Sequence, residues 1–318
     1  MKNIIITGAT GFVGKTLTRS IHERFPGANI LPLGTKDVDL SSQTESFRWF
    51  EHTASEFECD HIIHLATLYK AGDWPVRHPA TQFYVNMQIN TNLLEAWRRS
   101  MPDAKLTSIL SYCIYPSHSE PHPETEAYGT EPEDYLFAYA FTKKAMIIGQ
   151  RAYREEYGMR STSVVLPTVY GPGDSFEENS HVAGALVGKF VRAKRDGSPT
   201  VEVWGDGKQE REFIYVDDAA DGIITAAVGS EADLLNLGVG EAVSIDTVAR
   251  VIKEAAGFKG GIVYNNDRFV GVKRRVLDVS RMRNTLGWAA PTPLEEGLLR
   301  TVRWYEGVLD HDNSSIKN

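Results

Sequence analysis

Residues 1–14, MKNIIITGATGFVG, decide the fold of this 318-residue chain. The apolar run at 3–7 predicts a β-strand, and Gly8, Gly11 and Gly14 follow it at intervals of three residues. Glycines in such a loop permit a tight turn, a close approach of backbone N–H groups to a pyrophosphate, and packing of the next helix on the strand. The alternative is a plain turn, but the strand–loop–helix context favours a nucleotide-binding loop.

Short apolar runs and amphipathic stretches alternate through the N-terminal half. This alternation is typical of βαβ units and a parallel sheet. We therefore predict an α/β fold, with a Rossmann-type doubly wound parallel sheet and a smaller, mostly C-terminal α/β substrate lobe. The predicted strands are 3–7, 28–33, 61–65, 105–111 and 161–166, and later 200–204 and 212–216. The predicted helices are 14–25, 86–100, 138–157, 217–227 and 245–256.

The two domains are expected to interleave, because no Ser/Pro-rich linker separates them. Residues 1–167, with roughly 213–240, would form the cofactor-binding domain. Roughly 168–212 and 241–310 would form the second lobe, which binds the substrate. The polar end at 311–318 is expected to be a frayed tail.

Composition argues against several classes of protein. Hydrophobic content of 42% and charged content of 24% are ordinary for a globular domain. The net charge of −8 argues against binding nucleic acid or anionic membrane. Cys59 and Cys113 form no disulfide framework and suit a reducing compartment. No run approaches the ~20 apolar residues of a membrane span, and the first apolar run is too short for a signal peptide. We expect a cytoplasmic protein.

The end of the second strand, LPLGTKDVDL at 31–40, bears on the choice of cofactor. A carboxylate directly at the strand end would hold the ribose of NAD, whereas a basic residue would accept the 2′-phosphate of NADP. The strand end lacks that carboxylate and Lys36 is near, so we predict NADP(H), with NAD(H) as the alternative. The alternative interpretation of Lys36 is a solvated charge on the loop. Asp39 and Leu40 are expected to flank the adenine. The glycine loop would add contacts from Gly8, Thr10, Gly11, Phe12, Val13 and Gly14.

Tyr139 and Lys143 lie four residues apart in a predicted helix and therefore share one face. A nearby ammonium is expected to lower the tyrosine pKa, and the phenol could then protonate a ketone oxygen as hydride arrives. Lys143 could also hold the cofactor ribose. Ser111, at the carboxyl end of its strand, could bind the same ketone. An ordinary surface Tyr/Lys pair is the alternative.

Cys113 and His181 need a separate explanation, because ketone reduction does not require them. A ketone acidifies the neighbouring C–H, so a cysteine thiolate as base and a histidine as acid could invert that carbon. The alternatives are a small buried apolar cysteine and a loop histidine satisfied by backbone. The residues alone leave epimerisation open.

The motifs resemble those of the extended short-chain dehydrogenase/reductases, and within them the GDP-L-fucose synthases (GDP-4-keto-6-deoxy-mannose 3,5-epimerase-4-reductases). The glycine loop and the Tyr-x-x-x-Lys pair carry the wider resemblance. The narrower one rests on the stretches SYCIYP (111–116), AYAFTKKA (138–145), YGPGDSF (170–176), NSHVAGALVGKF (179–190), VEVWGDGKQEREFIYVDD (201–218), NLGVG (236–240) and GWAAPTPLEEGLLRTVRWY (287–305).

This resemblance implies NADPH-dependent 3,5-epimerisation and 4-keto reduction of a GDP-linked, or other nucleotide-diphosphate-linked, 4-keto-6-deoxy sugar. It assigns reduction to Ser111, Tyr139 and Lys143, and the base and acid to Cys113 and His181, with His181 also near the cofactor. It also implies a homodimer formed by the helices at 86–100 and 138–157. The implied substrate contacts are Lys189, Trp204, Arg211, and Arg274 or Arg275.

General chemistry agrees with these substrate contacts, since arginine suits a pyrophosphate and tryptophan can stack on a base. A core Trp204 and an ion-paired Arg211 are the alternatives. The chain departs from the family near the substrate and cofactor: Thr10 and Gly34 stand where arginines are usual, and Gly188 with Lys189 replace an arginine pair.

Three other functions stay open: a nucleotide-sugar reductase that has lost epimerisation, a 4-epimerase that retains NAD, and a non-enzymatic NADP-sensing protein. We predict no metal site.

Overall fold

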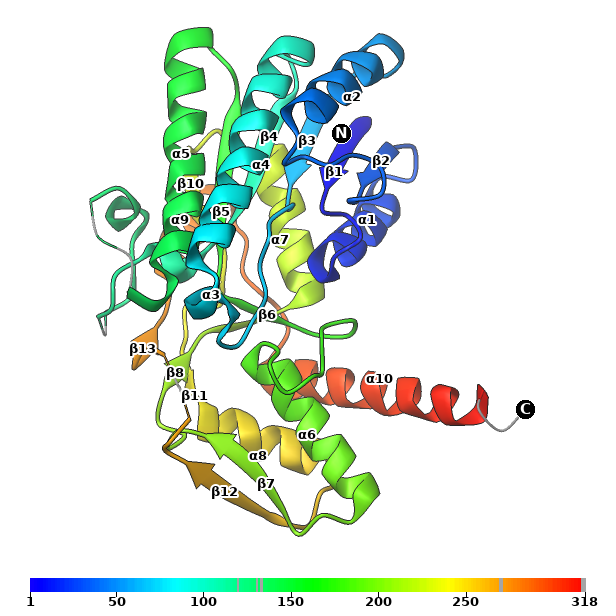
Figure 1. Cartoon of the computed structure of the whole chain (residues 1–318), viewed down its shortest axis with the longest axis vertical. Coiled ribbons are helices and arrows are strands. Elements are labelled where there is room, and N and C mark those ends of the chain that lie inside the picture. The colour runs from blue at the N-terminus through cyan, green and yellow to red at the C-terminus, as the bar shows by residue number, and fades with distance from the viewer. Residues whose placement is uncertain (119, 130, 132–133, 269–270, 316–318) are drawn as a thin grey trace.

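The computed structural model describes residues 1–118, 120–129, 131, 134–268 and 271–315. A six-stranded parallel sheet in the order β10-β5-β4-β3-β1-β2 forms its centre (Figure 1). The chain adds β2 on one side of β1 and all later strands on the other, so the order reverses between β1 and β3. Ligands of open α/β sheets bind at such a reversal. The strands are β1 (Asn3–Thr7), β2 (Asn29–Leu33), β3 (His61–His64), β4 (Lys105–Ser111), β5 (Ser161–Leu166) and β10 (Leu234–Asn236).

Helices cover both faces of this sheet, which confirms the predicted fold class. On β1, Ile4 and Ile6 belong to one buried core and Ile5 to the other, because successive side chains of a strand point to opposite faces. Helices α1 (Phe12–Arg24) and α7 (Val216–Gly229) pack together on the first face. The second face carries α2 (Gln43–Glu56), α4 (Pro79–Ser100) and α5 (Phe137–Tyr157).

A second layered region lies below the sheet in Figure 1 and has its own core, which includes Phe190, Ile252 and Val302. Its helices are α6 (Val182–Asp196), α8 (Ile245–Ala256) and α10 (Leu294–Ser315), and its paired strands are β7 (Thr200–Trp204) and β12 (Gly261–Asn265). Two small sheets join β11 (Val243–Ser244), β8 (Glu210–Arg211) and β13 (Arg274–Arg275), and β6 (Thr168–Tyr170) with β9 (Phe213–Tyr215). Short helices are α3 (Trp74–Arg77), α9 (Ser280–Leu286), η1 (Tyr112–Ile114), η2 (Glu124–Ala127) and η3 (Asp134–Leu136).

Two segments differ from the expected division of the chain. Leu277, Met282 and Trp288 pack in the cores of the large sheet, although we assigned their segment to the second lobe. Helix α10 continues to Ser315, so residues 311–315 are helical where we expected a frayed end. Residues 316–318 lie outside the described residues. The domain boundaries themselves stay a prediction. Among the described residues, no helix is long and apolar enough to cross a membrane.

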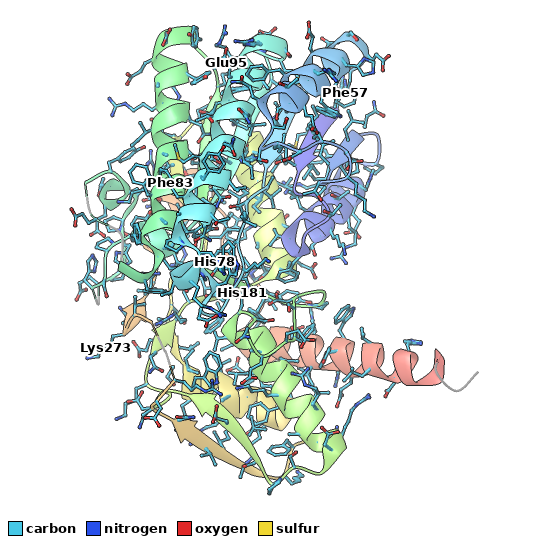
Figure 2. All side chains as sticks on the ribbon, viewed as in Figure 1. Phe57, His78, Phe83, Glu95, His181 and Lys273 are labelled. Atoms are coloured by element: carbon cyan, nitrogen blue, oxygen red, sulfur yellow. The ribbon has the colours of Figure 1, made fainter. Side chains whose placement is uncertain are left out.

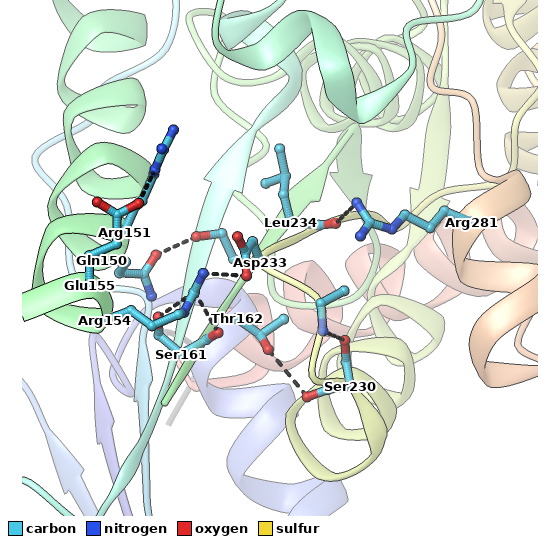
Figure 3. A network of polar contacts seen from close by, with 12 residues as sticks. Gln150, Arg151, Arg154, Glu155, Ser161, Thr162, Ser230, Asp233, Leu234 and Arg281 are labelled. Atoms are coloured by element: carbon cyan, nitrogen blue, oxygen red, sulfur yellow. Dashed lines mark hydrogen bonds and ion pairs between the residues drawn. The ribbon is translucent and has the colours of Figure 1, made fainter. Parts of the chain in front are cut away.

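Polar contacts fasten the far end of α5 to the sheet (Figure 3). Arg154 forms an ion pair with Asp233, and its Nη2 donates to Ser161 O at 3.1 Å and to Ser161 Oγ at 3.0 Å. Gln150 Oε1 accepts from Ser163 and, at 2.9 Å, from Ser108. These contacts hold the C-terminal part of α5 against β4 and β5. They therefore also fix the position of its N-terminal residues relative to the sheet.

A buried carboxyl joins three segments where the two layered regions meet. Glu212 Oε1 accepts from the backbone N–H of Val239 at 2.6 Å and of Gly240 at 3.0 Å, and Oε2 accepts from that of Leu277 at 2.7 Å. Burial raises the pKa of Glu212 to about 7, although the three N–H donors oppose the rise. The carboxyl therefore favours its protonated form below neutral pH.

We expect Glu212→Gln to destabilise the protein at pH 5 by about 1–3 kcal/mol, because an amide N–H₂ would face the Leu277 N–H where a carboxyl oxygen accepts. The contribution of a group with a raised pKa is present in full below its unfolded pKa of about 4.5 and is lost as pH rises through about 7. The difference in the free energy of unfolding between variant and wild type should therefore become smaller from pH 5 to pH 8, as measured by urea unfolding. Glu51→Gln, at an exposed position of α2, is the control. A gap that widens with pH would contradict this account.

Candidate active site

The glycine loop after β1 forms one wall of a deep cleft. Gly8 adopts φ +71°, and a Cβ there would lie 2.7 Å from Ala66 N, so a side chain is excluded. Gly11 is the N-cap residue of α1 and has no side chain to cap the helix. The first N–H groups of α1 are therefore left for a bound anion, as a dinucleotide loop requires.

The cleft has a volume of about 530 Å³ and brings together almost all of the predicted cofactor contacts. Lys36 is the exception, since it is exposed and does not line the cleft. Thr67, Leu68 and Tyr69, from the loop after β3, line it and were not anticipated. The predicted residues in the lining are Gly8, Thr10, Gly11, Phe12, Val13, Gly14, Asp39, Leu40, Tyr139, Lys143 and His181.

Tyr139 and Lys143 lie at the inner end of the cleft, both buried. Lys143 Nζ is 5.5 Å from the centre of the Tyr139 ring and donates to Ile109 O at 3.1 Å. Burial lowers the pKa of Lys143 to about 8. Burial also raises the pKa of Tyr139 well above its ordinary value, and the neighbouring Cys113 and Tyr69 add to the rise. The expected fall of the tyrosine pKa is therefore wrong for the protein alone, because burial dominates. A protonated phenol is suited to donating a proton.

Ser111 and Cys113 follow directly from the end of β4. The Ser111 side chain caps η1 by accepting from the Cys113 N–H at 3.4 Å. The Cys113 side chain is buried in a small cluster with Tyr139. Burial raises the pKa of Cys113, whereas Ser111, Arg275 and Lys143 act to lower it. The expected thiolate is therefore also wrong for the protein alone, because desolvation exceeds the effect of the two cations.

His181 lies at the mouth of the cleft, where the two layered regions meet (Figure 2). It is the N-cap residue of α6, and 43% of its side chain is exposed. Its Nδ1 is 3.8 Å from Oδ1 of the buried Asp174, and its ring stacks on Tyr69 at 5.7 Å between ring centres. The Tyr69 ring also contacts the Tyr139 ring at 4.8 Å, so Tyr69 connects the two predicted proton donors.

Sequence reasoning missed Asp174 and Tyr69 as site residues. Asp174 lies in the motif YGPGDSF, which we quoted only as a family stretch. Tyr69 follows β3 without a motif, and only the tertiary fold brings it to Tyr139 and His181.

A second pocket, of about 150 Å³, lies in the other layered region beneath His181 and α6. Three of the predicted substrate contacts line it, Lys189, Trp204 and Arg211. Lys189 Nζ and the Arg268 guanidinium each lie 5.1 Å from the centre of the Trp204 ring, and Arg268 was not anticipated. The pocket offers an indole and several cations, which suit a base and a diphosphate.

Arg274 and Arg275 lie outside the lining of this pocket. Arg274 Nε forms an ion pair with Glu210 at 2.9 Å. Arg275 is buried, and its guanidinium lies 5.2 Å from the ring centre of Tyr112. The Arg275 guanidinium therefore lies beside the segment of Cys113, although its backbone pairs with Arg211, which lines the second pocket.

Known proteins match the chain along nearly its whole length. Residues 4–238 match the family described as "NAD dependent epimerase/dehydratase family". The GDP-L-fucose synthase of Escherichia coli K12 is 33% identical over 319 residues, which cover 96% of each chain. The structure of a GDP-L-fucose synthetase from Naegleria fowleri bound to NADP is 27% identical with a TM-score of 0.86, covering 97% of this chain and 95% of that one. A GDP-6-OMe-4-keto-L-xylo-heptose reductase from Campylobacter jejuni is 25% identical with a TM-score of 0.86, covering 96% and 98%.

Proposed function

The chain belongs to the NAD-dependent epimerase/dehydratase family, and we propose that it catalyses NADPH-dependent 3,5-epimerisation and 4-keto reduction of a GDP-4-keto-6-deoxy-hexose. One observation carries the proposal: Tyr139, Lys143 and His181 line one cleft, and the cysteine proposed as base lies directly behind it. Cys113 packs against Tyr139, and Tyr69 contacts both Tyr139 and His181.

In the reduction, Tyr139 would protonate the C4 oxygen while Ser111 hydrogen-bonds it. The nicotinamide ring, when bound, supplies the hydride to C4. Lys143 would hold the cofactor ribose, and as a cation it would stabilise the phenolate that remains after proton transfer. Burial of Tyr139 supports this role, because a high pKa keeps the phenol protonated until charge develops on the ketone oxygen.

In the epimerisation, Cys113 would remove a proton beside the ketone and His181 would return one to the other face. Arg275 and Lys143 support the base role, because both act to lower the pKa of the buried Cys113. Asp174 Oδ1, which lies 3.8 Å from His181 Nδ1, would orient the imidazole for this transfer. The substrate ketone would stabilise the enolate between the two transfers.

For the cofactor we propose NADP rather than NAD. The similar structure from Naegleria fowleri is bound to NADP, which supports this choice. Lys36 is on the exposed turn after β2, beyond the cleft lining, from which a long flexible side chain could reach a 2′-phosphate.

For the substrate we propose that the second pocket takes the nucleoside diphosphate. Trp204 would stack on the base, and Lys189, Arg211 and Arg268 would neutralise the diphosphate. Glu178 would have to release Lys189 and Arg268, which it contacts at 4.0 and 3.8 Å. The relatives' names support a GDP-linked sugar.

We also propose a homodimer that pairs α4 and α5 of two copies. Exposed apolar side chains support this interface: the rings of Phe83 and Phe141 contact each other at 5.8 Å, and Ile148 lies farther along α5. The cytoplasm remains the proposed location, since both cysteines are free.

Two related activities compete with this proposal. A reductase without epimerisation is favoured by the likeness to the Campylobacter jejuni reductase. A 4-epimerase would keep its cofactor bound and show no net redox. An assay of NADPH consumption against GDP-, dTDP- and CDP-linked 4-keto sugars in D₂O tests all three. The proposal requires stoichiometric oxidation of NADPH with the GDP sugar, together with deuterium in the sugar ring. Oxidation of NADPH without deuterium in the sugar ring would instead indicate a reductase that does not epimerise its substrate.

We expect Cys113→Ser to lose ring-proton exchange with D₂O by at least about a hundredfold while NADPH binding persists, because a serine hydroxyl is a much weaker acid than a thiol. Tyr139→Phe should keep the exchange and lose reduction to a similar extent. Both are measured by NMR and by NADPH absorbance. Cys59→Ser, which changes the chain's other cysteine, is the matched control. Exchange that survives in Cys113→Ser would remove this residue from the mechanism.

Lys36→Ala should weaken NADPH binding at least about tenfold and leave NADH binding unchanged, because only NADPH carries the 2′-phosphate. Fluorescence titration with both cofactors gives the two affinities. Lys259→Ala, at an exposed position in the second layered region, controls for a general change of charge. Equal losses for the two cofactors would defeat the cofactor proposal.

Phe141→Glu should convert the dimer to a monomer, because it would bury a charge in the α4–α5 interface. Light scattering measures the mass. Val263→Glu is the matched control, since Val263 is 49% exposed and Phe141 is 51% exposed. A wild type that is monomeric, or a Phe141→Glu variant that stays dimeric, would place the interface elsewhere.

A further inference from the structure

The segment between β4 and α5, at the left of Figure 1, brings together two histidines and a glutamate outside the proposed active site. His118, His122 and Glu126 follow one another at intervals of four residues. We propose that these three side chains bind a divalent transition-metal ion, with Zn²⁺ as the best fit. The sequence analysis predicted no metal site.

The three ligand atoms converge on one point. His118 Nε2 lies 3.0 Å and His122 Nδ1 lies 2.8 Å from the same oxygen, Oε2 of Glu126. The ligand atoms of all three side chains lie within 4.8 Å of one another. Tetrahedral Zn²⁺, with bonds of about 2.0–2.1 Å, needs neighbouring ligand atoms roughly 3.3 Å apart. The two distances to Glu126 Oε2 would have to lengthen by only a few tenths of an ångström to admit the ion.

The chemistry of the three ligands selects the class of metal. Two imidazoles and one carboxylate suit Zn²⁺ better than Ca²⁺ or Mg²⁺, which prefer oxygen ligands. The His118 and Glu126 side chains are 36% and 27% exposed, which leaves a path for the ion and a position for water as fourth ligand.

The arrangement is held in place before any ion binds. His122 is fully buried, and its backbone donates to Val276 O and accepts from Asp278 N, each at 3.0 Å. Its ring stacks on Tyr115 with the ring centres 5.1 Å apart and the planes within 2°. Among the described residues, His118 Nδ1 and His122 Nε2 are buried without a hydrogen-bond partner. Among the described residues, Glu126 is thus the hydrogen-bond partner of both imidazole side chains.

The ion would bind to a segment that borders the active site and pairs with a second one. Tyr115 follows Cys113 by two residues, and His122 pairs through its backbone with the segment after Arg275. All three ligands lie in the segment after β4, so the ion would make that segment more rigid, and the backbone pairing of His122 with Leu277 already holds it to the segment after β13. We therefore assign the ion a structural role, and it takes no part in the proton transfers.

The test uses the full chain without an affinity tag, dialysed against chelator. Titration with Zn²⁺ should show one tight site per chain and a higher melting temperature, and Co²⁺ should give the visible absorption of a tetrahedral site with nitrogen and oxygen ligands. His118→Ala and Glu126→Gln should each weaken Zn²⁺ binding by at least about tenfold and remove the cobalt spectrum. His118 is partly exposed, so its replacement should leave the metal-free melting temperature nearly unchanged.

His52→Ala is the matched control, because His52 and Glu56 form an exposed pair with the same spacing of four residues at 4.0 Å. It should bind Zn²⁺ like the wild type. A wild type that takes up no Zn²⁺ would overturn the proposal. So would Zn²⁺ binding that His118→Ala and Glu126→Gln leave intact, which would place the ion elsewhere, for example at Cys113 and His181. Either result leaves the proposed enzymatic function untouched.

Discussion

The close approach of the loop after β1 to the loop after β3 positions the rest of the active site. Gly8 takes a left-handed conformation directly against Ala66, and no other residue type fits there without a shift of backbone. This contact fixes the path of residues 66–69 across the ends of the strands. Tyr69 is thereby placed between Tyr139 and His181, which come from α5 and the start of α6. The contact between Gly8 and Ala66 therefore helps to position the groups proposed for both reactions.

Much of the sheet could be predicted because its strands are short runs in which nearly every side chain is buried. The bounds of β1, β4 and β5 agree with the prediction, and the hydroxyl residues inside β4 and β5, among them Thr107 and Ser163, are small enough to be buried beside the apolar ones. Helix α4 begins at Pro79, seven residues before the predicted start. Its first turns carry polar side chains that only the fold reveals as buried, among them Gln82 and Asn86.

The catalytic side chains could be predicted from local spacing, but their ionisation could not. Tyr139 and Lys143 share a helical face wherever that helix lies, so their pairing is visible in the sequence. Their burial depends on how α5 sits over β4 and β5, and burial controls the pKa values of Tyr139, Lys143 and Cys113. Desolvation favours the neutral form of all three. A site of this kind holds its protons until a substrate introduces charge.

Strand β9 has a consequence for how the molecule unfolds. Its middle residue, Ile214, belongs to the core of the large sheet, while its neighbours Phe213 and Tyr215 belong to the core of the second region. Neither core is complete without this strand, and a strand of three residues cannot be divided between two separately folding pieces. The two regions should therefore melt together as one cooperative unit, despite the interleaved path of the chain.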